Sequence, residues 1–411
     1  SMTSRRRASM ISYAQALETI LCNLPKVPRQ ERLPLTAACQ RILSRAVAAP
    51  HDMPPFDQSL MDGFALRSRD TREAAPGQPV RLTLGATLTA GEFLEQPLLP
   101  RQAGRIMTGA PIPPGADAVV KMEDSAADSG RLVVHRPLDR WVNVQRRGRE
   151  IRRRTVVLRP GEGLTPQRIG TALALGLADV DVAQRPRVAL VAPGDELLPP
   201  GAPLQPAMKW CSNLYALQLR ARELGCAGIN LGIVPDTLES LTEALRGGLE
   251  NDLVIILGAS GRGQHDFAAR AMEAVGAELL FRGVAANPGR GVTVARHEQT
   301  LIVGLPGSPW GSFVGFEAFV RPAIRRLLGQ PPFPRRLTAA VKAAVRVRPG
   351  ATHFFPCRLQ AVSEGWEATL LGDLLDLSRA DSQPLGLLVM PPYRRLLRAG
   401  SRASIWPLAM D

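Results

Sequence analysis

The chain has 411 residues and a formal net charge of +14, with 51 lysines and arginines against 37 aspartates and glutamates. Its apolar content of 45% is that of a globular protein, and the length allows several hydrophobic cores. No stretch approaches the ~20 consecutive apolar residues of a membrane span. The basic N-terminal segment has no apolar stretch after it, so we expect no secretory signal.

The positive charge is carried almost entirely by arginine, because the chain contains only four lysines: Lys26, Lys121, Lys209 and Lys342. A strong positive charge is typical of nucleic-acid binding. Here, however, the arginines are scattered, only 5% of the residues are aromatic, and no nucleic-acid-binding module is visible. Attraction of small anionic substrates explains the charge at least as well, and we expect no nucleic-acid partner.

The five cysteines lie far apart and form no Cys-x-x-Cys pair. This spacing is evidence against a disulfide framework and against a zinc cluster. It favours the reducing environment of the cytoplasm.

The pattern at the start of the chain predicts helices over residues 9–50. Tyr13, Leu17 and Leu21 recur at helical spacing. We expect a second helix over residues 35–49, which the segment 51–55, with its two prolines, would end.

A β-rich region is predicted next, over residues 75–140, from short alternating runs and many prolines and glycines. Just before it, Asp62-Gly63 is a turn signal beside a cluster of polar side chains. Thr108 lies in a proline- and glycine-rich loop ahead of a strand, where a hydroxyl either binds a ligand or satisfies the backbone.

The densest run of charge, residues 146–154, contains six arginines around Glu150. A solvated surface is the ordinary interpretation of such a run. The carboxylate of Glu150 should stay ionised among these arginines. Residues 165–178 are predicted to form a helix, since Pro166 suits its first turn.

Between residues 187 and 329 the chain alternates regularly between strand and helix patterns. The alternation predicts an open, mostly parallel sheet with helices on both faces. Ligands of such sheets bind beyond the carboxyl ends of the strands. Asp195, Glu196 and the turn 304–309 all follow predicted strands and should meet at this edge.

The central strand of this region is the apolar run Leu253–Leu257, followed by a glycine-rich loop and a helix that begins near Asp266. A strand, a glycine loop and a helix N-terminus together form an anion site. An ordinary tight turn between strand and helix is the competing interpretation. The loop is neither Gly-x-Gly-x-x-Gly nor a Walker loop, which disfavours ordinary dinucleotide and nucleoside triphosphate sites.

These elements predict a multidomain α/β protein. We expect a helical domain from residues 9–50 and 142–185, a β-rich arm domain over 51–141, an α/β domain over 186–329 and a small C-terminal β-domain over 335–411. Residues 330–334, with three prolines, read as a linker.

Over nearly the whole chain, the motifs resemble those of the molybdopterin molybdenumtransferase (MoeA) family. This family is related to the E domain of gephyrin. The motifs that carry the resemblance are Phe56-Asp-Gln-Ser-Leu-Met-Asp-Gly-Phe-Ala65, Ile106-Met-Thr-Gly-Ala-Pro-Ile-Pro-Pro-Gly-Ala-Asp-Ala-Val-Val120, Pro193-Gly-Asp-Glu-Leu197, Leu231-Gly-Ile-Val-Pro-Asp236 and Gly304-Leu-Pro-Gly-Ser-Pro309. The second and the last are long and specific.

The resemblance implies insertion of molybdate into adenylylated molybdopterin, with release of AMP and assistance from Mg²⁺. The positions that match the family's functional polar residues are Glu196, Asp266, Asp62, Thr108 and Glu150, and Glu196 and Asp266 are the expected metal ligands. The expected cradle for pterin and phosphate consists of Gly258, Ser260, Gly261, Arg262, Gly263, Asn287, Gly289, Arg290, Pro306, Gly307 and Ser308. The resemblance also implies a homodimer, in which Asp62 and Thr108 act across the subunit interface from Glu196 and Asp266.

The chain departs from the family pattern in the loops that would face the ligand. Ala259 replaces a glycine, Arg262 adds a charge, and Asn287 replaces a lysine and so removes one. Arg290 also replaces a lysine, and the two cations are not interchangeable at an oxyanion site. A lost charge-assisted hydrogen bond to phosphate would cost on the order of 1.5–3 kcal/mol.

These departures leave two alternatives to a working enzyme. One is a divergent paralogue that carries molybdenum cofactor or its precursor, or assists maturation, without catalysing insertion. The other is a different nucleotide-bearing ligand on the same scaffold. Turnover would separate the enzyme from the carrier.

Overall fold

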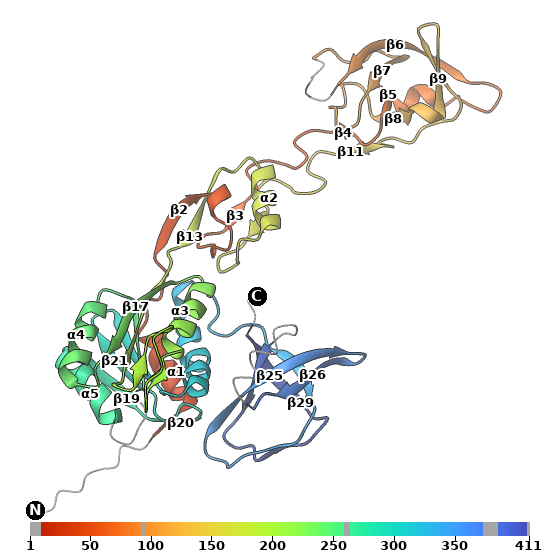
Figure 1. Cartoon of the computed structure of the whole chain (residues 1–411). Coiled ribbons are helices and arrows are strands. Elements are labelled where there is room, and N and C mark those ends of the chain that lie inside the picture. The colour runs from red at the N-terminus through yellow and green to blue at the C-terminus, as the bar shows by residue number, and fades with distance from the viewer. Residues whose placement is uncertain (1–9, 90, 92–94, 259–263, 373–384, 409–411) are drawn as a thin grey trace, which may run out of the picture. The chain divides into compact units, whose positions relative to one another are not determined.

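The computed structural model describes residues 10–89, 91, 95–258, 264–372 and 385–408, and of residues 86 and 264–266 the backbone alone. The chain divides into two compact units (Figure 1). The first unit comprises residues 1–45, 160–166 and 179–411, and the second comprises residues 46–159 and 167–178. The prediction of a multidomain α/β protein is confirmed, whereas the exact division into four domains stays a prediction.

A six-stranded sheet forms the centre of the first unit. The strand order is β17 (Ala227–Val234), β14 (Arg187–Pro193), β18 (Leu253–Leu257), β22 (Thr300–Leu305), β21 (Thr293–His297) and β19 (Glu278–Arg282). The first four strands are parallel, and β21 and β19 continue the sheet in antiparallel pairing. The predicted open, mostly parallel sheet is therefore confirmed.

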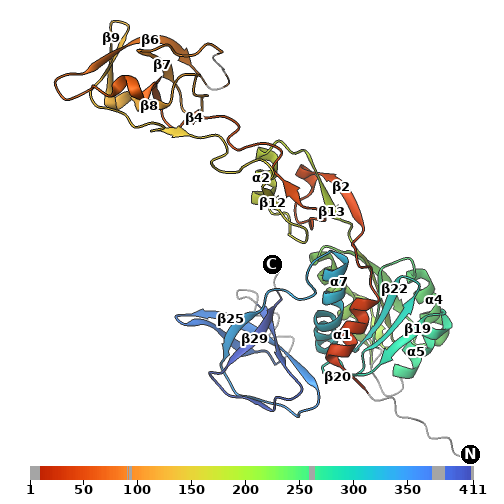
Figure 2. The ribbon, with the colours of Figure 1, turned by 180° about the vertical axis from the view of Figure 1, so that it is seen from behind.

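Helices cover both faces of this sheet (Figures 1 and 2). One face packs against α1 (Tyr13–Cys22), α3 (Asn213–Glu223), α6 (Pro309–Gly315) and α7 (Arg321–Leu327). The other packs against α4 (Leu238–Gly248) and α5 (Gln264–Ala274). Alternate strand residues divide between the two cores, since Val188 and Leu190 face the first and Ala189 and Val191 the second. No helix in the described part of the chain is long and apolar enough to cross a membrane.

The helix predicted over residues 35–49 is wrong. Only Leu35–Ala37 forms a single 3-10 turn, and the strand β3 (Val47–Ala48) closes the segment. Long-range pairing overrides the helical spacing: β2 (Gln30–Pro34) pairs antiparallel with β13 (Asp179–Ala183), and the Leu43 N–H donates to the Glu162 carbonyl at 2.9 Å. Of the helices expected over residues 9–50, only α1 forms, and it packs in the core of the α/β sheet.

The second unit is built on a six-stranded sheet, as the alternating runs predicted. Its order is β8 (Ala118–Lys121), β5 (Gly63–Leu66), β7 (Gln102–Ile106), β6 (Val80–Leu88), β10 (Arg131–Val134) and β9 (Ser125–Asp128). A Cβ at Gly63 would lie 2.0 Å from the Val120 carbonyl oxygen, so the pairing of β5 with β8 requires glycine there.

Shorter elements complete the second unit. They are β4 (Gln58–Ser59) paired with β11 (Val144–Gln145), β3 paired with β12 (Val156–Leu158), and nearly all of α2 (Pro166–Ala174). The helix predicted over residues 165–178 is confirmed as α2, which ends a turn earlier than expected.

The C-terminal part of the first unit is a β-domain, as predicted. Five strands close on themselves in the order β25 (Thr352–Val362), β26 (Gly365–Leu370), β23 (Leu337–Val341), β29 (Arg402–Pro407) and β27 (Leu385–Met390), because β27 pairs with both β29 and β25. The same sheet continues through β20 (Val284–Asn287) to β1 (Ile11–Ser12).

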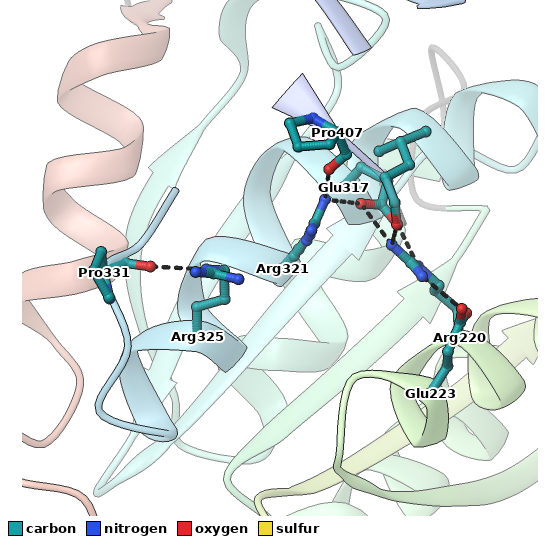
Figure 3. A network of polar contacts seen from close by, with 8 residues as sticks. Arg220, Glu223, Glu317, Arg321, Arg325, Pro331 and Pro407 are labelled. Atoms are coloured by element: carbon teal, nitrogen blue, oxygen red, sulfur yellow. Dashed lines mark hydrogen bonds and ion pairs between the residues drawn. The ribbon is translucent and has the colours of Figure 1, made fainter. Parts of the chain in front are cut away.

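A buried carboxylate joins this β-domain to the α/β layer (Figure 3). Glu317 lies in η4, a π-helix (Phe316–Val320), and its side chain is 1% exposed. It accepts from Arg220 of α3 at 2.7 Å and from Arg321 at 3.3 Å. The same two guanidiniums donate to the main chain at the end of β29, to the carbonyls of Leu408 at 2.6 Å and Pro407 at 2.7 Å.

Arg220 remains charged although it is buried. Burial alone lowers the pKa of Arg220, but the charge of Glu317 and its hydrogen bonds outweigh burial, so the net pKa is raised. The hydroxyl of Tyr13, on α1, donates to the Ala318 carbonyl in the same π-helix at 2.7 Å. Helix α1, helix α3 and the last strand thus meet at one turn.

We predict that Glu317→Ala destabilises the chain by about 3–5 kcal/mol, because two buried guanidiniums lose their carboxylate. Chemical denaturation would measure the loss. The matched control is Glu367→Ala, whose side chain is 32% exposed and pairs with Lys342 at 3.8 Å. The control should change the free energy of unfolding by less than about 1 kcal/mol, and an equally small change for Glu317→Ala would contradict the prediction.

Candidate functional site

A pocket of about 460 Å³ lies at the carboxyl ends of the parallel strands of the first unit. This is the edge at which open α/β sheets bind their ligands. Its described lining residues come from the ends of β14 and β18, the segment before α3 and the turn after β22. They are Ala192, Pro193, Glu196, Leu197, Lys209, Trp210, Cys211, Ser212, Asn213, Leu257, Gly258, Gly307, Ser308 and Pro309.

The described pocket lining includes a glycine after each of two neighbouring strands, Gly258 after β18 and Gly307 after β22. Gly258 has a φ of +104°, which favours glycine. A Cβ at Gly307 would lie 3.0 Å from the Gly258 Cα, so the two strand ends approach closely. The side chain of Asn213, at the start of α3, donates to the Gly307 carbonyl at 2.7 Å and holds this turn.

Two of the predicted cradle residues have structural partners in this turn. The hydroxyl of Ser308 accepts from the Gly311 N–H at 3.2 Å and caps α6. Pro306 packs under the same helix, where a Cβ at Gly311 would lie 3.0 Å from it.

Glu196 and Lys209 form an ion pair in the pocket. The Lys209 Nζ lies 3.1 Å from the Glu196 Oε1, and the two side chains are 67% and 45% exposed. The Lys209 N–H also donates to the Glu196 carbonyl at 2.9 Å, beside the parallel pairing of β15 (Leu197–Leu198) with β16 (Lys209–Trp210). Lys209 is the one cationic side chain among the described residues that line the pocket.

Asp236 is an acidic residue that the sequence analysis did not assign to the site. Burial raises the pKa of its carboxyl, and the charges of Asp195 and Glu196 raise it further. The Asp195 carboxylate accepts from the Asp236 N–H at 3.1 Å. The signal was present in the sequence, since the motif Leu231–Asp236 ends at this residue.

The predicted metal ligands are described only in part. Asp266 lies in the first turn of α5, and its side chain is outside the described residues. In the described part of the chain, no group of three or more His, Cys, Asp or Glu side chains is arranged to hold a metal. Mg²⁺ is commonly held by one or two carboxylates together with substrate phosphates. Glu196, which faces the pocket, fits that smaller requirement as a single ligand.

In the second unit, the structure brings Asp62 and Thr108 together. The Asp62 carboxylate accepts from the Thr108 N–H at 2.7 Å and from its hydroxyl at 2.8 Å. These two hydrogen bonds hold the pKa of Asp62 below its usual range, the backbone donor contributing most. The pair is exposed on the turn before β5 and the turn after β7.

Glu150 belongs to a loop that is fixed by carboxylates from elsewhere in the second unit. Asp52 accepts from the Arg153 N–H at 2.8 Å and from Arg147 Nε at 2.7 Å, and Asp57 accepts from the Arg147 N–H at 2.7 Å. Glu150 itself accepts from the Gln145 side chain at 2.6 Å and is otherwise exposed. The run 146–154 is therefore an ordered loop.

The structure does not bring Asn287, Gly289 and Arg290 into the pocket, since none of them is among its described lining residues. Asn287 ends β20, and its side-chain nitrogen lies 3.3 Å from the His353 Nδ1. A Cβ at Gly289 would lie 3.0 Å from the ring of Phe319, so this glycine serves core packing. Their predicted part in ligand binding stays a prediction, and Ser260, Gly261, Arg262 and Gly263 lie outside the described residues.

Two family models match successive parts of the chain. Residues 11–176 match the family model described as "MoeA N-terminal region (domain I and II)". Residues 189–326, which hold the pocket, match the model described as "Probable molybdopterin binding domain". The fold and the pocket thus define a protein of the molybdopterin-binding class.

Individual relatives show which family within this class the chain belongs to. A molybdopterin molybdenumtransferase 2 from Mycobacterium tuberculosis is 32% identical over 408 residues, which cover 96% of this chain and 99% of the relative. The Bacillus subtilis molybdopterin molybdenumtransferase is 36% identical, with coverage of 75% and 73%. A solved structure of a molybdopterin biosynthesis MoeA protein from Pyrococcus horikoshii has a TM-score of 0.86 at 28% identity, over 98% of this chain and 100% of that one. The chain belongs to the molybdopterin molybdenumtransferase (MoeA) family.

We predict that Thr108→Val raises the pKa of Asp62 toward its ordinary value, because one of two hydrogen bonds to the carboxylate is lost while the backbone donor remains. A depressed pKa stabilises the folded state above the unfolded value of ~3.9, and this effect is lost as the pH falls through the folded pKa. The carboxyl carbon signal of Asp62 in an NMR titration would report the shift. Thr83→Val, in β6 of the same unit, is the control, and identical Asp62 titrations in all three proteins would refute the assignment.

We also predict that Gly307→Ala destabilises the chain by about 1–3 kcal/mol, because the new Cβ must push against the backbone of Gly258. Gly247→Ala is the matched control. It lies inside α4 with nothing within 4 Å of the new Cβ, so it should stabilise by about 0.5–1 kcal/mol. Chemical denaturation would measure the free energy of unfolding of both variants, and we expect changes of opposite sign. No change for Gly307→Ala would mean that the strand ends have room to separate.

Proposed function

We propose that this chain takes adenylylated molybdopterin and molybdate, inserts molybdenum into the pterin, and releases AMP. The observation that carries the proposal is the pocket at the carboxyl edge of the parallel sheet, inside the residues that match the molybdopterin-binding family model. The curated relatives from Bacillus subtilis and Mycobacterium tuberculosis are named molybdopterin molybdenumtransferases. The chain is accordingly a transferase of molybdenum cofactor biosynthesis.

The pocket suits the phosphates of such a substrate. Gly258 and Gly307, two of the described lining residues, carry no side chain, so a phosphoanhydride can approach the main chain closely at these positions. The first turn of α3, an eleven-residue helix, begins beside the pocket at Asn213, and the positive end of its dipole favours an anion. These features are independent of the loop residues in which the chain departs from its family.

Glu196 and Asp266 are the carboxylates that we assign to the reaction. Glu196 faces the pocket and would contribute a ligand to Mg²⁺, and Asp266 begins the helix that follows β18. When bound, Mg²⁺ would neutralise phosphate charge and polarise the phosphoanhydride. Asp62 is held ionised by Thr108, which makes it suited to orienting a polar group of the substrate or a water molecule. Glu150 completes the set by its family position.

We also propose a homodimer in the cytoplasm, with Asp62 and Thr108 of one protomer serving the pocket of its partner. The resemblance to the MoeA family supports the dimer. All five cysteines are free, and three of them are buried. Free thiols support a reducing compartment.

We predict that Glu196→Ala and Asp266→Ala each abolish insertion, with a loss of at least about a hundredfold for removal of one preorganised group that stabilises the transition state, while the folded state persists. The assay follows AMP release and cofactor formation in one reaction with molybdate, adenylylated molybdopterin and Mg²⁺. The control is Glu278→Ala. Glu278 lies on β19, and its exposed side chain pairs with Arg296 on β21.

Three outcomes of that assay have different meanings. Molybdate-dependent AMP release by the wild type, lost in both variants, supports the proposal and the site. Tight binding without release would make the chain a carrier. Wild-type activity in both variants would reject the site assignment while leaving the activity intact.

A further inference from the structure

The described lining of the pocket contains one cation and one anion, Lys209 and Glu196. The two neutralise each other at 3.1 Å. A substrate with two phosphates brings negative charge that this lining must balance. The chain carries Asn287 where its family carries lysine, and Asn287 and Arg290 are not among the described lining residues. Lys209 is thus the described side chain whose charge and location match the need.

We propose that Lys209 binds a phosphate oxygen of the substrate and is, among the described lining residues, the charged side chain that recognises the anion. In the absence of ligand, the ion pair with Glu196 holds the Lys209 ammonium in the pocket. When the phosphate binds, the ammonium pairs with the phosphate instead of with Glu196. The identity of the substrate rests on the proposed function, whereas the chemistry of the ligand, a phosphate ester, rests on the pocket.

The main chain fixes the base of this lysine on both sides. The Lys209 N–H donates to the Glu196 carbonyl at 2.9 Å, and the Cys211 N–H donates to the Leu198 carbonyl at 2.8 Å. The indole N–H of Trp210 donates to the Ala202 carbonyl at 2.9 Å, which holds the intervening residue. The Cα of Lys209 therefore has a set position at the rim, while its long side chain remains free to change partner.

The ion pair between Lys209 and Glu196 can be broken at little cost in free energy. Both side chains are substantially exposed, at 67% and 45%, and exposed pairs contribute little to stability. A phosphate offers the ammonium more charge and more acceptor oxygens than one carboxylate does. Exchange also releases Glu196, so binding of the anion and exposure of the proposed catalytic carboxylate would occur together.

The test uses Lys209→Gln and Lys209→Arg in the full chain, with AMP, inorganic pyrophosphate and adenylylated molybdopterin as probes in calorimetry. Lys209→Gln should weaken binding of all three about ten- to a hundredfold, the loss expected for one charge-assisted hydrogen bond. Lys209→Arg should recover part of it, because it keeps the charge but not the geometry. The control is Lys342→Gln, which removes a lysine that is 61% exposed and pairs with Glu367 at 3.8 Å. It should bind like the wild type.

A purely structural role for Lys209 predicts a different pattern. If Lys209 only positions Glu196, then Lys209→Gln lowers kcat and leaves the affinity for AMP and pyrophosphate unchanged, which would overturn the proposal. Glu196→Gln separates the two cases further, since freeing Lys209 should leave anion affinity equal to or tighter than that of the wild type. Weakening by Glu196→Gln as large as that by Lys209→Gln would also overturn it.

The wild-type protein distinguishes failure of the inference from failure of the proposed function. Binding of AMP or pyrophosphate without molybdate-dependent turnover would reject the function and leave the Lys209 comparison decisive. Turnover with no effect of Lys209→Gln on affinity would reject the inference alone. A wild type that binds none of the three probes would reject both.

Discussion

The buried carboxylate of Glu317 is the constraint on which the arrangement of the first unit depends. It neutralises two guanidiniums, Arg220 and Arg321, and each of these also donates to a main-chain carbonyl at the end of β29. Charged groups are tolerated in a protein interior only when they are paired and hydrogen-bonded. These contacts hold α3, the π-helix and the last strand together (Figure 3). Because α3 begins at the pocket with Asn213, the same constraint helps to locate the site.

The pocket results from the topology of the sheet combined with the absence of side chains at two positions. Parallel strands deliver their carboxyl ends to one edge, and Gly258 and Gly307 let two of these ends approach to van der Waals contact. At these two glycines the described lining offers main chain, and one ion pair and the start of a helix lie in the same pocket. Such a surface can bind phosphate without depending on a particular loop side chain. The loop substitutions that distinguish this chain from its family are for that reason compatible with phosphate binding at Gly258 and Gly307.

Electrostatics separates the candidate residues into groups with different tasks. Asp62 is kept ionised by the hydrogen bonds of Thr108, whereas the pKa of Asp236 is raised by burial and by the charges of Asp195 and Glu196. Glu196 forms an exposed ion pair with Lys209 in the pocket. The arginine-rich loop around Glu150 donates hydrogen bonds to the carboxylates of Asp52 and Asp57. The high positive charge of the chain is thus partly committed to local pairs.

The sequence by itself determined the α/β alternation, the buried central strand Leu253–Leu257 and the family, because periodicity and long motifs are local properties. Only the tertiary structure decided that residues 35–49 form one short strand and isolated bridges instead of a helix, since their partners lie more than a hundred residues away in β12 and β13. It likewise decided that Lys209 and Glu196 share the pocket while Asn287 and Gly289 do not line its described part. Motif resemblance names positions, but which charges face one another depends on strand order and on the path of each loop, and these are properties of the whole fold.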